Sequence, residues 1–457
     1  MSGIADLVAA QRGYFATGAT RDLKLRYDTL EQLLRLVEGA EGELNAALRT
    51  DLGKPAFEAY ATEFGLFTEE LRFIKARLYS WSRPRRVRTP LFDFPAKTRI
   101  HPEPYGTAAI LAPWNYPFLL LAAPTLGALA AGNTAVLKPS EFAPATAAFV
   151  EKLINDNFPP ELLVVVTGEA QTARELLAQP LDYIFFTGSP AVGKKVMQAA
   201  AERLTPLTLE LGGKSPAVVD ADAELKVCAR RLIWGKFINA GQTCIAPDYV
   251  LVRAGIKDRL LELLKAQIER FYGAEPRKSA DYARIVNDRH LERLIALIDE
   301  EKVYCGGEYD RQTRYLAPTI LDGVGWGDAV MQEEVFGPLL PVLTFNDLGE
   351  ALAAINARPR PLALYYFGQD RRHKRRVVEE CSFGGGCINE TVMHMVTSRA
   401  PFGGVGRSGM GAYNGRWSFD TFTHYKTVLE KGTWLDIPLR YPPYDEQKLR
   451  WTRRFLG

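Results

Sequence analysis

The sequence predicts an α/β fold in which helices cover both faces of a parallel sheet. Four strand–helix units follow one another between residues 107 and 204, and consecutive parallel strands need such helical crossovers. The chain has 457 residues, of which 47% are hydrophobic, enough for two or three domains with buried cores. The stretch between Glu103 and Lys138 carries no charge but contains several prolines and asparagines. A buried strand, loop and helix therefore explain it better than a membrane span.

The four units are visible as apolar strands that alternate with helical runs. The predicted strands cover residues 107–112, 133–140, 162–168 and 183–188, and the helices after them cover 118–131, 144–155, 172–179 and 190–204. Amphipathic helices precede these units over residues 22–79. A second series extends from about 214 to 385, with a helix over 258–273, and a glycine-rich, then strand-like portion covers 397–440. Ligands of such sheets bind beyond the carboxyl ends of the strands.

Charge and cysteine content exclude several classes of function. The net charge of +3 is too small to imply a nucleic-acid partner, and we interpret the basic runs 83–88 and 371–376 as solvated surface. The five cysteines are an odd, sparse set without a disulfide framework or zinc-site spacing, so we expect neither disulfides nor a metal. The N-terminus has Asp6 and no long apolar region, so we expect no signal peptide.

One cysteine stands out by its position. In "INAGQTCIAPDY" (238–249), Cys244 follows a Gly-Gln-Thr turn instead of lying within an apolar run. A free cysteine is usually a small buried hydrophobic residue, which is the conservative interpretation. A cysteine on a turn can also act as a nucleophile, because its sulfur can meet a substrate.

The turn after the fourth strand, "FTGSPAVG" (186–193), favours a dinucleotide. Gly188 and Gly193 bracket the start of a helix, where backbone N–H groups and the helix dipole attract a pyrophosphate. Pro190 suits the first helical turn, because a missing N–H costs nothing there. A glycine turn alone is weak evidence, but it follows a clean strand within a series of strand–helix units.

Two further residues allow several interpretations. Glu210 alternates with leucines in "PLTLELGGKSP" (206–216), just before a Gly-Gly turn. It is a solvent-facing glutamate, a carboxylate that binds a ribose, or a general base, and spacing alone does not choose among these. Asn115 lies between two prolines and is either an ordinary turn residue or a preorganised donor to an oxyanion.

Taken together, the motifs resemble the aldehyde dehydrogenase family. They occur in that family's order and cover nearly the whole chain: "PWNYP", "KPSE" (138–141), "FTGS", "LELGGKSP", "GQTCIAPDY", "QEEVFGP" (332–338) and "PFGGVGRSGMG" (401–411). "GQTCIAPDY", the "MHM" around His394 and the short N-terminus look most like the class 3 branch, which handles fatty and aromatic aldehydes.

The resemblance implies a fold and a domain organisation. It implies a Rossmann-type parallel-sheet domain for NAD(P), an α/β catalytic domain and a small β element for oligomerisation. By position, residues 1–81 and 106–208 match the cofactor domain and 209–414 the catalytic domain. Residues 82–105 and 415–440 match the oligomerisation strands, and 441–457 form a C-terminal tail.

The resemblance also implies roles for single residues. Cys244 matches the nucleophile, Glu210 the general base, and Asn115 the side-chain half of an oxyanion hole completed by the Cys244 N–H. The residues that match cofactor-binding positions are Trp114, Lys138, Glu141, Gly188, Ser189, Gly193, Glu334 and Phe336. The candidates for the substrate pocket are Tyr60, Tyr116, Trp234 and Phe402. Pro190 departs from the wider family, which has threonine in this turn, and so removes one side-chain contact.

The implied reaction is NAD(P)-dependent oxidation of an apolar aldehyde to the carboxylic acid, through a thiohemiacetal and a thioester on Cys244. The alternatives are a CoA-acylating aldehyde dehydrogenase and a non-enzymatic dinucleotide-binding protein. From Glu141 we expect NAD to be preferred and NADP to be usable. The class 3 resemblance implies a homodimer, without a nucleic-acid partner. Because the tail carries no apolar run, we expect a cytoplasmic protein without a membrane partner.

Overall fold

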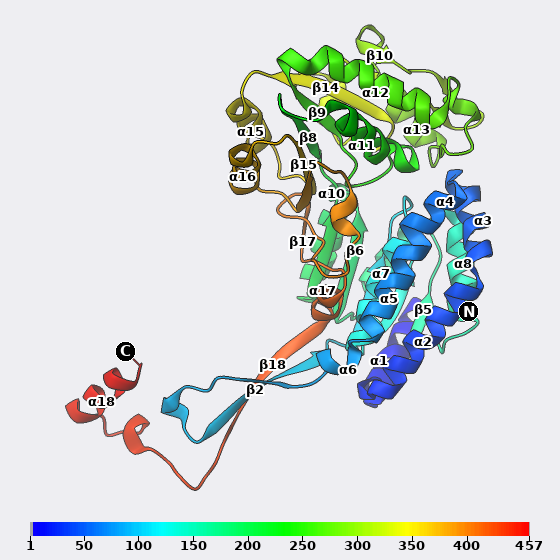
Figure 1. The fold of residues 1–457 in the computed structure, drawn as a ribbon. Helices are drawn as coiled ribbons and strands as arrows, with labels where there is room; N and C mark the ends of the chain where they lie inside the picture. The colour runs from blue at the N-terminus through cyan, green and yellow to red at the C-terminus, as the bar shows by residue number, and fades with distance from the viewer. Residues whose placement is uncertain (1–2, 457) are drawn as a thin grey trace.

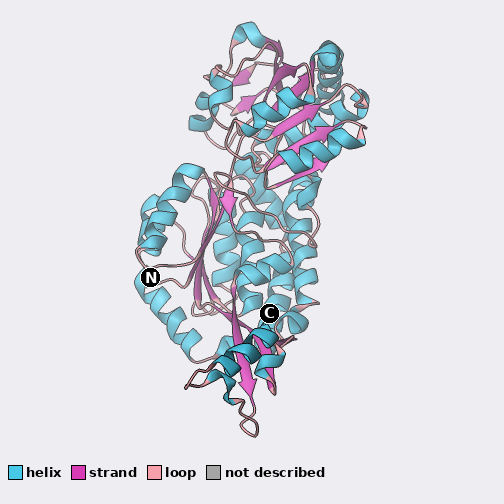
Figure 2. Ribbon diagram, turned by 90° about the vertical axis from the view of Figure 1, so that its left-hand side faces the viewer, coloured by secondary structure: helices cyan, strands magenta, loops and turns pink. Residues whose placement is uncertain are grey.

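A computed structural model describes residues 3–456 (Figure 1). The chain folds into two lobes, each built on a mostly parallel sheet, and an arm that projects away from them. The side view in Figure 2 shows helices packed around the strands of both lobes. The predicted α/β fold is confirmed.

The first lobe contains the four predicted strand–helix units. The strands are β3 (Thr107–Leu111), β4 (Thr134–Lys138), β5 (Leu163–Val165), β6 (Tyr183–Gly188) and β7 (Leu207–Leu211). The helices that follow the first four are α7 (Leu119–Ala131), α8 (Pro144–Asn155), α9 (Ala170–Leu177) and α10 (Pro190–Ala201). The sheet order is β17-β7-β6-β3-β4-β5, and only the short β17 (Gly409–Met410) is antiparallel. The chain therefore reverses direction across the sheet between β3 and β6.

Both faces of this sheet are buried, because its side chains alternate between two cores. In β3, Ala109 and Leu111 join the core under α9 and α10, while Ala108 and Ile110 join the large core shared with α7. The helices α2 (Leu23–Gly39), α3 (Glu41–Leu52) and α5 (Gly65–Lys75) complete the second face, as the predicted amphipathic region 22–79 requires.

An N-terminal helix was not predicted. Residues Ile4–Ala16 form α1, which packs against β3 and β4. Its Gln11 is fully buried and donates hydrogen bonds to the carbonyls of Ala135 and Pro160, at 2.9 and 3.0 Å. Gln11 interrupts the apolar pattern of this segment, but in the structure it is buried and attaches the helix to the sheet.

The second lobe is built on a sheet of order β10-β13-β14-β9-β8-β15-β16, parallel except at β10. Its strands are β8 (Pro216–Val219), β9 (Tyr249–Arg253), β10 (Val303–Cys305), β13 (Thr319–Leu321), β14 (Leu339–Phe345), β15 (Ala363–Phe367) and β16 (Gly385–Ile388). The helices α11 (Leu225–Phe237), α12 (Lys257–Tyr272), α13 (Asp288–Ile295), α15 (Leu348–Asn356) and α16 (Arg371–Glu380) connect them. The helix predicted over 258–273 is α12.

The arm is a three-stranded antiparallel sheet of order β1-β2-β18. It is formed by β1 (Arg85–Val87), β2 (Ala96–Pro104) and β18 (Thr423–Lys431). In the portion 397–440, which we expect to be glycine-rich and then strand-like, β18 is preceded by a short helix that was not predicted, α17 (Arg416–Thr421). This helix packs on α7 so closely that a Cβ on Gly127 would lie 2.5 Å from the Ser418 carbonyl oxygen. The tail also contains a helix, α18 (Glu446–Leu456).

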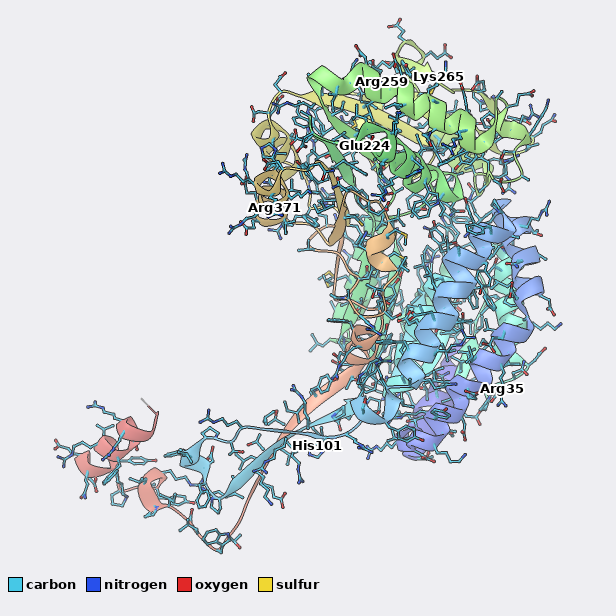
Figure 3. All side chains as sticks on the ribbon, in the orientation of Figure 1. Arg35, His101, Glu224, Arg259, Lys265 and Arg371 are labelled. Atoms are coloured by element: carbon cyan, nitrogen blue, oxygen red, sulfur yellow. The ribbon has the colours of Figure 1, made fainter. Side chains whose placement is uncertain are left out.

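The two basic runs lie on the surface, as expected. Arg83, Arg85, Arg86 and Arg88 are exposed on the arm. Arg371 begins α16 and extends outward, like Arg259 and Lys265 on α12 (Figure 3). Within residues 3–456, none of the helices combines the length and hydrophobicity that a membrane crossing requires.

Candidate active site

The candidate site lies where the two sheets meet. The loop after β3 carries Trp114 and Asn115, and β6 ends at Gly188, just before the turn that leads to α10. These neighbouring strands mark the point where the chain reverses direction, which is the usual ligand position in such sheets. From the other lobe come loops at the amino ends of strands. The loop before β9 carries Cys244, and the loop before β14 carries Glu334.

The loop that carries Cys244, residues 238–248, has an unusual backbone. Asn239, Ala240 and Gly241 adopt left-handed φ angles of 53°, 51° and 76°. A Cβ on Gly241 would overlap the carbonyl oxygen of Gly337, so only glycine fits there. Cys244 follows on a turn and is partly exposed, as the sequence predicts.

Hydrogen bonds fix this loop to the loop after β3. The Asn115 side chain donates from Nδ2 to the carbonyl of Gln242 at 3.0 Å. The Asn239 side chain donates to the backbone carbonyl of Asn115 at 2.8 Å. The hydroxyls of Tyr116 and Thr243 are 2.6 Å apart. Since an amide nitrogen carries two hydrogens, Asn115 keeps one donor for another partner.

Glu210 is buried in β7, with 3% of its surface exposed. The alternative of a solvent-facing glutamate is therefore wrong, because the strand is covered on both faces. Neither carboxylate oxygen has a hydrogen-bond partner among the described residues. Burial raises the pKa of Glu210 well above its ordinary value, because the charged form is disfavoured away from water.

Cys244 lies within electrostatic reach of two carboxyl groups. Burial, then the charges of Glu334 and Glu210, raise the pKa of its thiol to about 12, although the N–H groups of Cys244 and Ile245 oppose the shift. The thiol is consequently protonated at neutral pH in the free protein. Turnover through the sulfur would need its thiolate form, which becomes more abundant as the pH rises.

Glu334 rests against the Gly-Gly turn after β7. A Cβ on Gly212 would overlap its carboxylate, and Gly213 donates a backbone hydrogen bond to it. Burial, followed by the charge of Asp248, raises the pKa of Glu334 to about 8. Asp248 accepts from Val335 N at 2.8 Å and thereby fixes the loop that carries Glu334.

The turn after β6 fits a dinucleotide. Ser189 is the N-cap of α10, and its hydroxyl accepts from Val192 N at 3.4 Å. Pro190 occupies the first helical position. A Cβ on Gly193 would press into Leu211 of β7, so glycine lets the helix approach the sheet. A helix N-terminus close to the sheet is the geometry that binds pyrophosphate.

Further polar and aromatic groups lie along the same edge of the sheet. At the end of β4, Lys138 Nζ is 2.9 Å from Glu141 Oε2. The Trp114 ring lies between Phe336 and His290, at centroid distances of 5.3 and 5.0 Å. These positions fit the adenosine and nicotinamide ends of a dinucleotide, because they offer hydroxyl partners at one end and flat apolar surfaces at the other.

The four pocket candidates differ in burial and in the contacts they make. Tyr116 is buried and bonded to the loop of Cys244, and Phe402 is buried against Tyr413 and His394. Tyr60 is 49% exposed in a short π-helix, where it packs on Phe64. Trp234 is partly exposed on α11. The hydroxyl of Tyr116 thus ties one of the four candidates directly to the loop of Cys244.

Several residues of the site were missed by sequence reasoning. Lys236 on α11 is fully buried, and its Nζ has no partner within residues 3–456. Burial lowers its pKa to about 8. Glu58 accepts from Asn239 N at 3.0 Å. Lys54 and Glu63 form a fully buried ion pair beside Asn115. Their burial comes from tertiary packing, so no local sequence signal marked them.

Comparison with known proteins gives consistent matches. Residues 4–428 match the model of the aldehyde dehydrogenase family. The 4,4'-diaponeurosporen-aldehyde dehydrogenase of Staphylococcus aureus is 47% identical over 447 residues, covering 97% of both chains. Aldehyde dehydrogenase family 3 member A2 of Rattus norvegicus is 44% identical, covering 97% of this chain and 92% of that protein.

Solved structures match as well. A substrate-bound Staphylococcus aureus AldH superposes with a TM-score of 0.98, at 46% identity and full coverage of both chains. An NAD-dependent aldehyde dehydrogenase from Sinorhizobium meliloti gives 0.86 at 28% identity, covering 95% and 89%. A glyceraldehyde-3-phosphate dehydrogenase from Methanocaldococcus jannaschii complexed with NADP gives 0.85 at 25%, covering 94% of both chains.

Proposed function

Since this chain belongs to the aldehyde dehydrogenase family and is therefore an oxidoreductase, we propose that it oxidises apolar aliphatic or aromatic aldehydes to carboxylic acids. One observation carries the proposal. A partly exposed cysteine on a turn lies within electrostatic reach of a buried glutamate whose oxygens have no partner in the described chain. This pairs a nucleophile with a general base.

In the proposed reaction, the thiolate form of Cys244 adds to the aldehyde carbon and forms a thiohemiacetal. The oxygen that becomes charged is stabilised by the second N–H of Asn115 and by the Cys244 amide. Bound NAD(P)⁺ supplies the hydride acceptor that converts this adduct to a thioester. The hydrogen bond between the hydroxyls of Tyr116 and Thr243, and the one that Asn115 donates to Gln242, hold the loop of Cys244 during these steps.

Glu210 would act after oxidation. A carboxylate whose pKa is raised by burial is a stronger base than an exposed one, and its free oxygens leave room for a water molecule. Glu210 takes a proton from that water, the water oxygen attacks the thioester carbon, and the acid leaves while Cys244 is restored. A CoA-acylating reaction does not need such a base.

For the cofactor, we propose that NAD is preferred and NADP is usable. The residues proposed to bind it are Trp114, Lys138, Glu141, Gly188, Ser189, Gly193, Glu334 and Phe336. Glu141 can accept hydrogen bonds from ribose hydroxyls, but a 2′-phosphate would bring like charges together. At 4 Å that repulsion is about 4 kcal/mol per charge pair at an effective dielectric of 20. Lys138, paired with Glu141, offsets part of it.

The apolar substrate class is supported by the aromatic candidates Tyr60, Tyr116, Trp234 and Phe402, and by the relative named for diaponeurosporen-aldehyde. Formation of NADH from hexanal or benzaldehyde, with and without CoA, tests the proposal. Acid and NADH in equal amounts without CoA support it. A strict requirement for CoA, or no turnover with any aldehyde of an aliphatic and aromatic panel, contradicts it.

We further propose a cytoplasmic homodimer. β18 is an edge strand of the arm with nine residues, and its Val428 and Leu429 are 43% and 45% exposed. A long, partly apolar edge is suited to pairing with another strand. Sedimentation at micromolar concentration should give a dimer, and a monomer there contradicts the assignment of the arm.

A further inference from the structure

Glu58 connects the N-terminal helices to the loop that carries Cys244. It lies in α4 (Ala56–Ala59), far from Cys244 in sequence, and its side chain is partly buried. Its Oε2 accepts a hydrogen bond from the backbone amide of Asn239 at 3.0 Å. Asn239 is the first of the three left-handed residues that precede Gln242 and Cys244.

This segment needs external support. Left-handed backbone is unfavourable for residues with a Cβ, and Asn239 and Ala240 both adopt it. The Asn239 side chain is engaged with the carbonyls of Asn115 and Gln242. Glu58 is the group that binds the backbone amide at the start of the segment, so its carboxylate sets where the turn begins.

The residues just after this segment form the proposed reaction centre. The carbonyl of Gln242 orients the Asn115 amide, and the Cys244 amide and sulfur come two residues later. We propose that Glu58 is a positioning residue, which holds the left-handed loop so that Cys244 and Asn115 keep their reacting geometry. The inference rests on the proposed function for its kinetic consequences, but not for the structural role of the bond.

Glu58 also makes this support sensitive to pH. Burial is the largest influence and raises its pKa to about 7. Lys54 opposes the rise, Asp281 adds to it, and Tyr116, Tyr272 and Tyr282 also face the carboxyl. Above pH 7 the group is a carboxylate, which is a stronger acceptor than the protonated acid. The bond to Asn239 therefore tightens as the pH rises through 7.

The test uses alkylation of Cys244 by iodoacetamide, which requires neither aldehyde nor cofactor, together with steady-state turnover. Glu58→Ala should lower kcat about 10–100-fold and leave the KM for NAD nearly unchanged, because a small misplacement of reacting groups has an effect of that size. Glu58→Gln keeps an acceptor, so most of kcat should return. In the wild type, the alkylation rate plotted against pH should show an inflection near pH 7, where Glu58 ionises. This inflection should disappear in both variants.

Glu70→Gln is the matched control. Glu70 is also buried with a pKa raised by burial to about 7, and it also accepts from the amide of a left-handed residue, Gly415, at 2.8 Å. The Glu70→Gln variant should retain the inflection near pH 7 in the alkylation rate.

Unchanged kcat and an unchanged pH profile in folded Glu58→Ala overturn the inference, as does an equal effect of Glu70→Gln. If Glu58→Ala does not fold, the profile of Glu58→Gln decides. Wild-type protein without dehydrogenase activity contradicts the proposed function, while alkylation still tests Glu58.

Discussion

Glu210 and Asp220 are both buried, each with 3% of its surface exposed, yet their surroundings are opposite. Glu210 lies between the lobes, and its oxygens find no partner in the part of the chain described. Asp220 follows β8 at the far end of the second sheet and accepts from Ala221 N, the Tyr366 hydroxyl and His373, at 2.8, 3.0 and 2.7 Å. Burial raises the pKa of Glu210. At Asp220 the hydrogen bonds outweigh burial and lower it.

The difference distinguishes a structural carboxyl from the one that we propose as a general base. Buried polar atoms in proteins are almost always hydrogen-bonded, so an unpartnered one needs an explanation. Asn115 Oδ1 and Lys236 Nζ also lack partners among residues 3–456, although such atoms occur outside the site as well, as at Gln11 Oε1. In the site, these are the positions at which a substrate, a cofactor or water would complete the hydrogen bonding. Burial alone would not have separated the two acids.

The largest expected effect comes from the sulfur beside Glu210. Cys244→Ala should lower dehydrogenase turnover about 10³-fold or more, because no other group can form the thioester. The control is Cys305→Ala, whose thiol lies on β10 in the second lobe and should leave turnover unchanged. Circular dichroism would establish that both variants are folded. Appreciable turnover by Cys244→Ala would refute the covalent mechanism.

Glu210→Gln tests the free carboxyl itself. The variant should release NADH in a rapid burst and then turn over about 10²–10⁴-fold more slowly, since the base acts after oxidation. Stopped-flow absorbance at the NADH band measures both phases. If burst and steady state decline equally, Glu210 serves binding or structure, and the contrast with Asp220 loses its meaning.

Asp220→Asn tests the buried carboxyl whose oxygens have hydrogen-bond partners. It should destabilise the protein by about 1–3 kcal/mol at pH 7 and leave kcat unchanged, because it removes an acceptor from buried donors. The folded pKa is lowered, so this stabilisation is present above the unfolded value of 3.8 and is lost as the pH falls through the folded value. Urea unfolding at pH 7 and pH 3 checks the sign. A large loss of kcat in an Asp220→Asn variant of normal stability would contradict the structural role of Asp220.

The same comparison predicts an opposite stability effect for Glu210→Gln. The folded pKa of Glu210 is raised above the unfolded value of 4.5, so ionisation disfavours the folded state as the pH rises. Glutamine does not ionise. The variant should therefore melt about 1–3 °C above the wild type at pH 8 and close to it at pH 5. Calorimetry without cofactor measures this, and a lower melting temperature at pH 8 would show that Glu210 has partners in solution.

Glu141 lies between Glu210 and Asp220 in its number of partners. It follows the carboxyl end of β4 and pairs with Lys138. Glu141→Gln should narrow the preference for NAD over NADP about three- to tenfold, because the loss of charge weakens the ribose contact and relieves repulsion of a 2′-phosphate. The ratio of kcat/KM for the two cofactors in wild type and variant measures it. An unchanged ratio removes Glu141 from cofactor selection.

The sequence predicted elements whose signal is local. The strands from 107 to 188 and the turn "FTGSPAVG" appear where expected, since apolar runs, glycines and Pro190 act within a few residues. The residues next to Glu210 in the sequence did not decide among its possible roles. Period-two alternation tells which face a side chain takes, but not that β17 and β6 flank the strand. Glu58 and Lys236 escaped notice for the same reason, because their partners and burial come from the other lobe or from tertiary packing.

The register of the arm has a consequence for biosynthesis. β2 pairs with β18, and Lys426 bonds to Glu103 across a separation of 323 residues. A ribosome adds about 5–20 residues per second, so β2 waits roughly 16–65 s for its partner. Throughout that interval the first lobe can begin to fold around β3 to β6, while the edge of β2 is open to other chains. The arm is therefore completed only after residues 423–431 have been synthesised, and any assembly through it must follow that step.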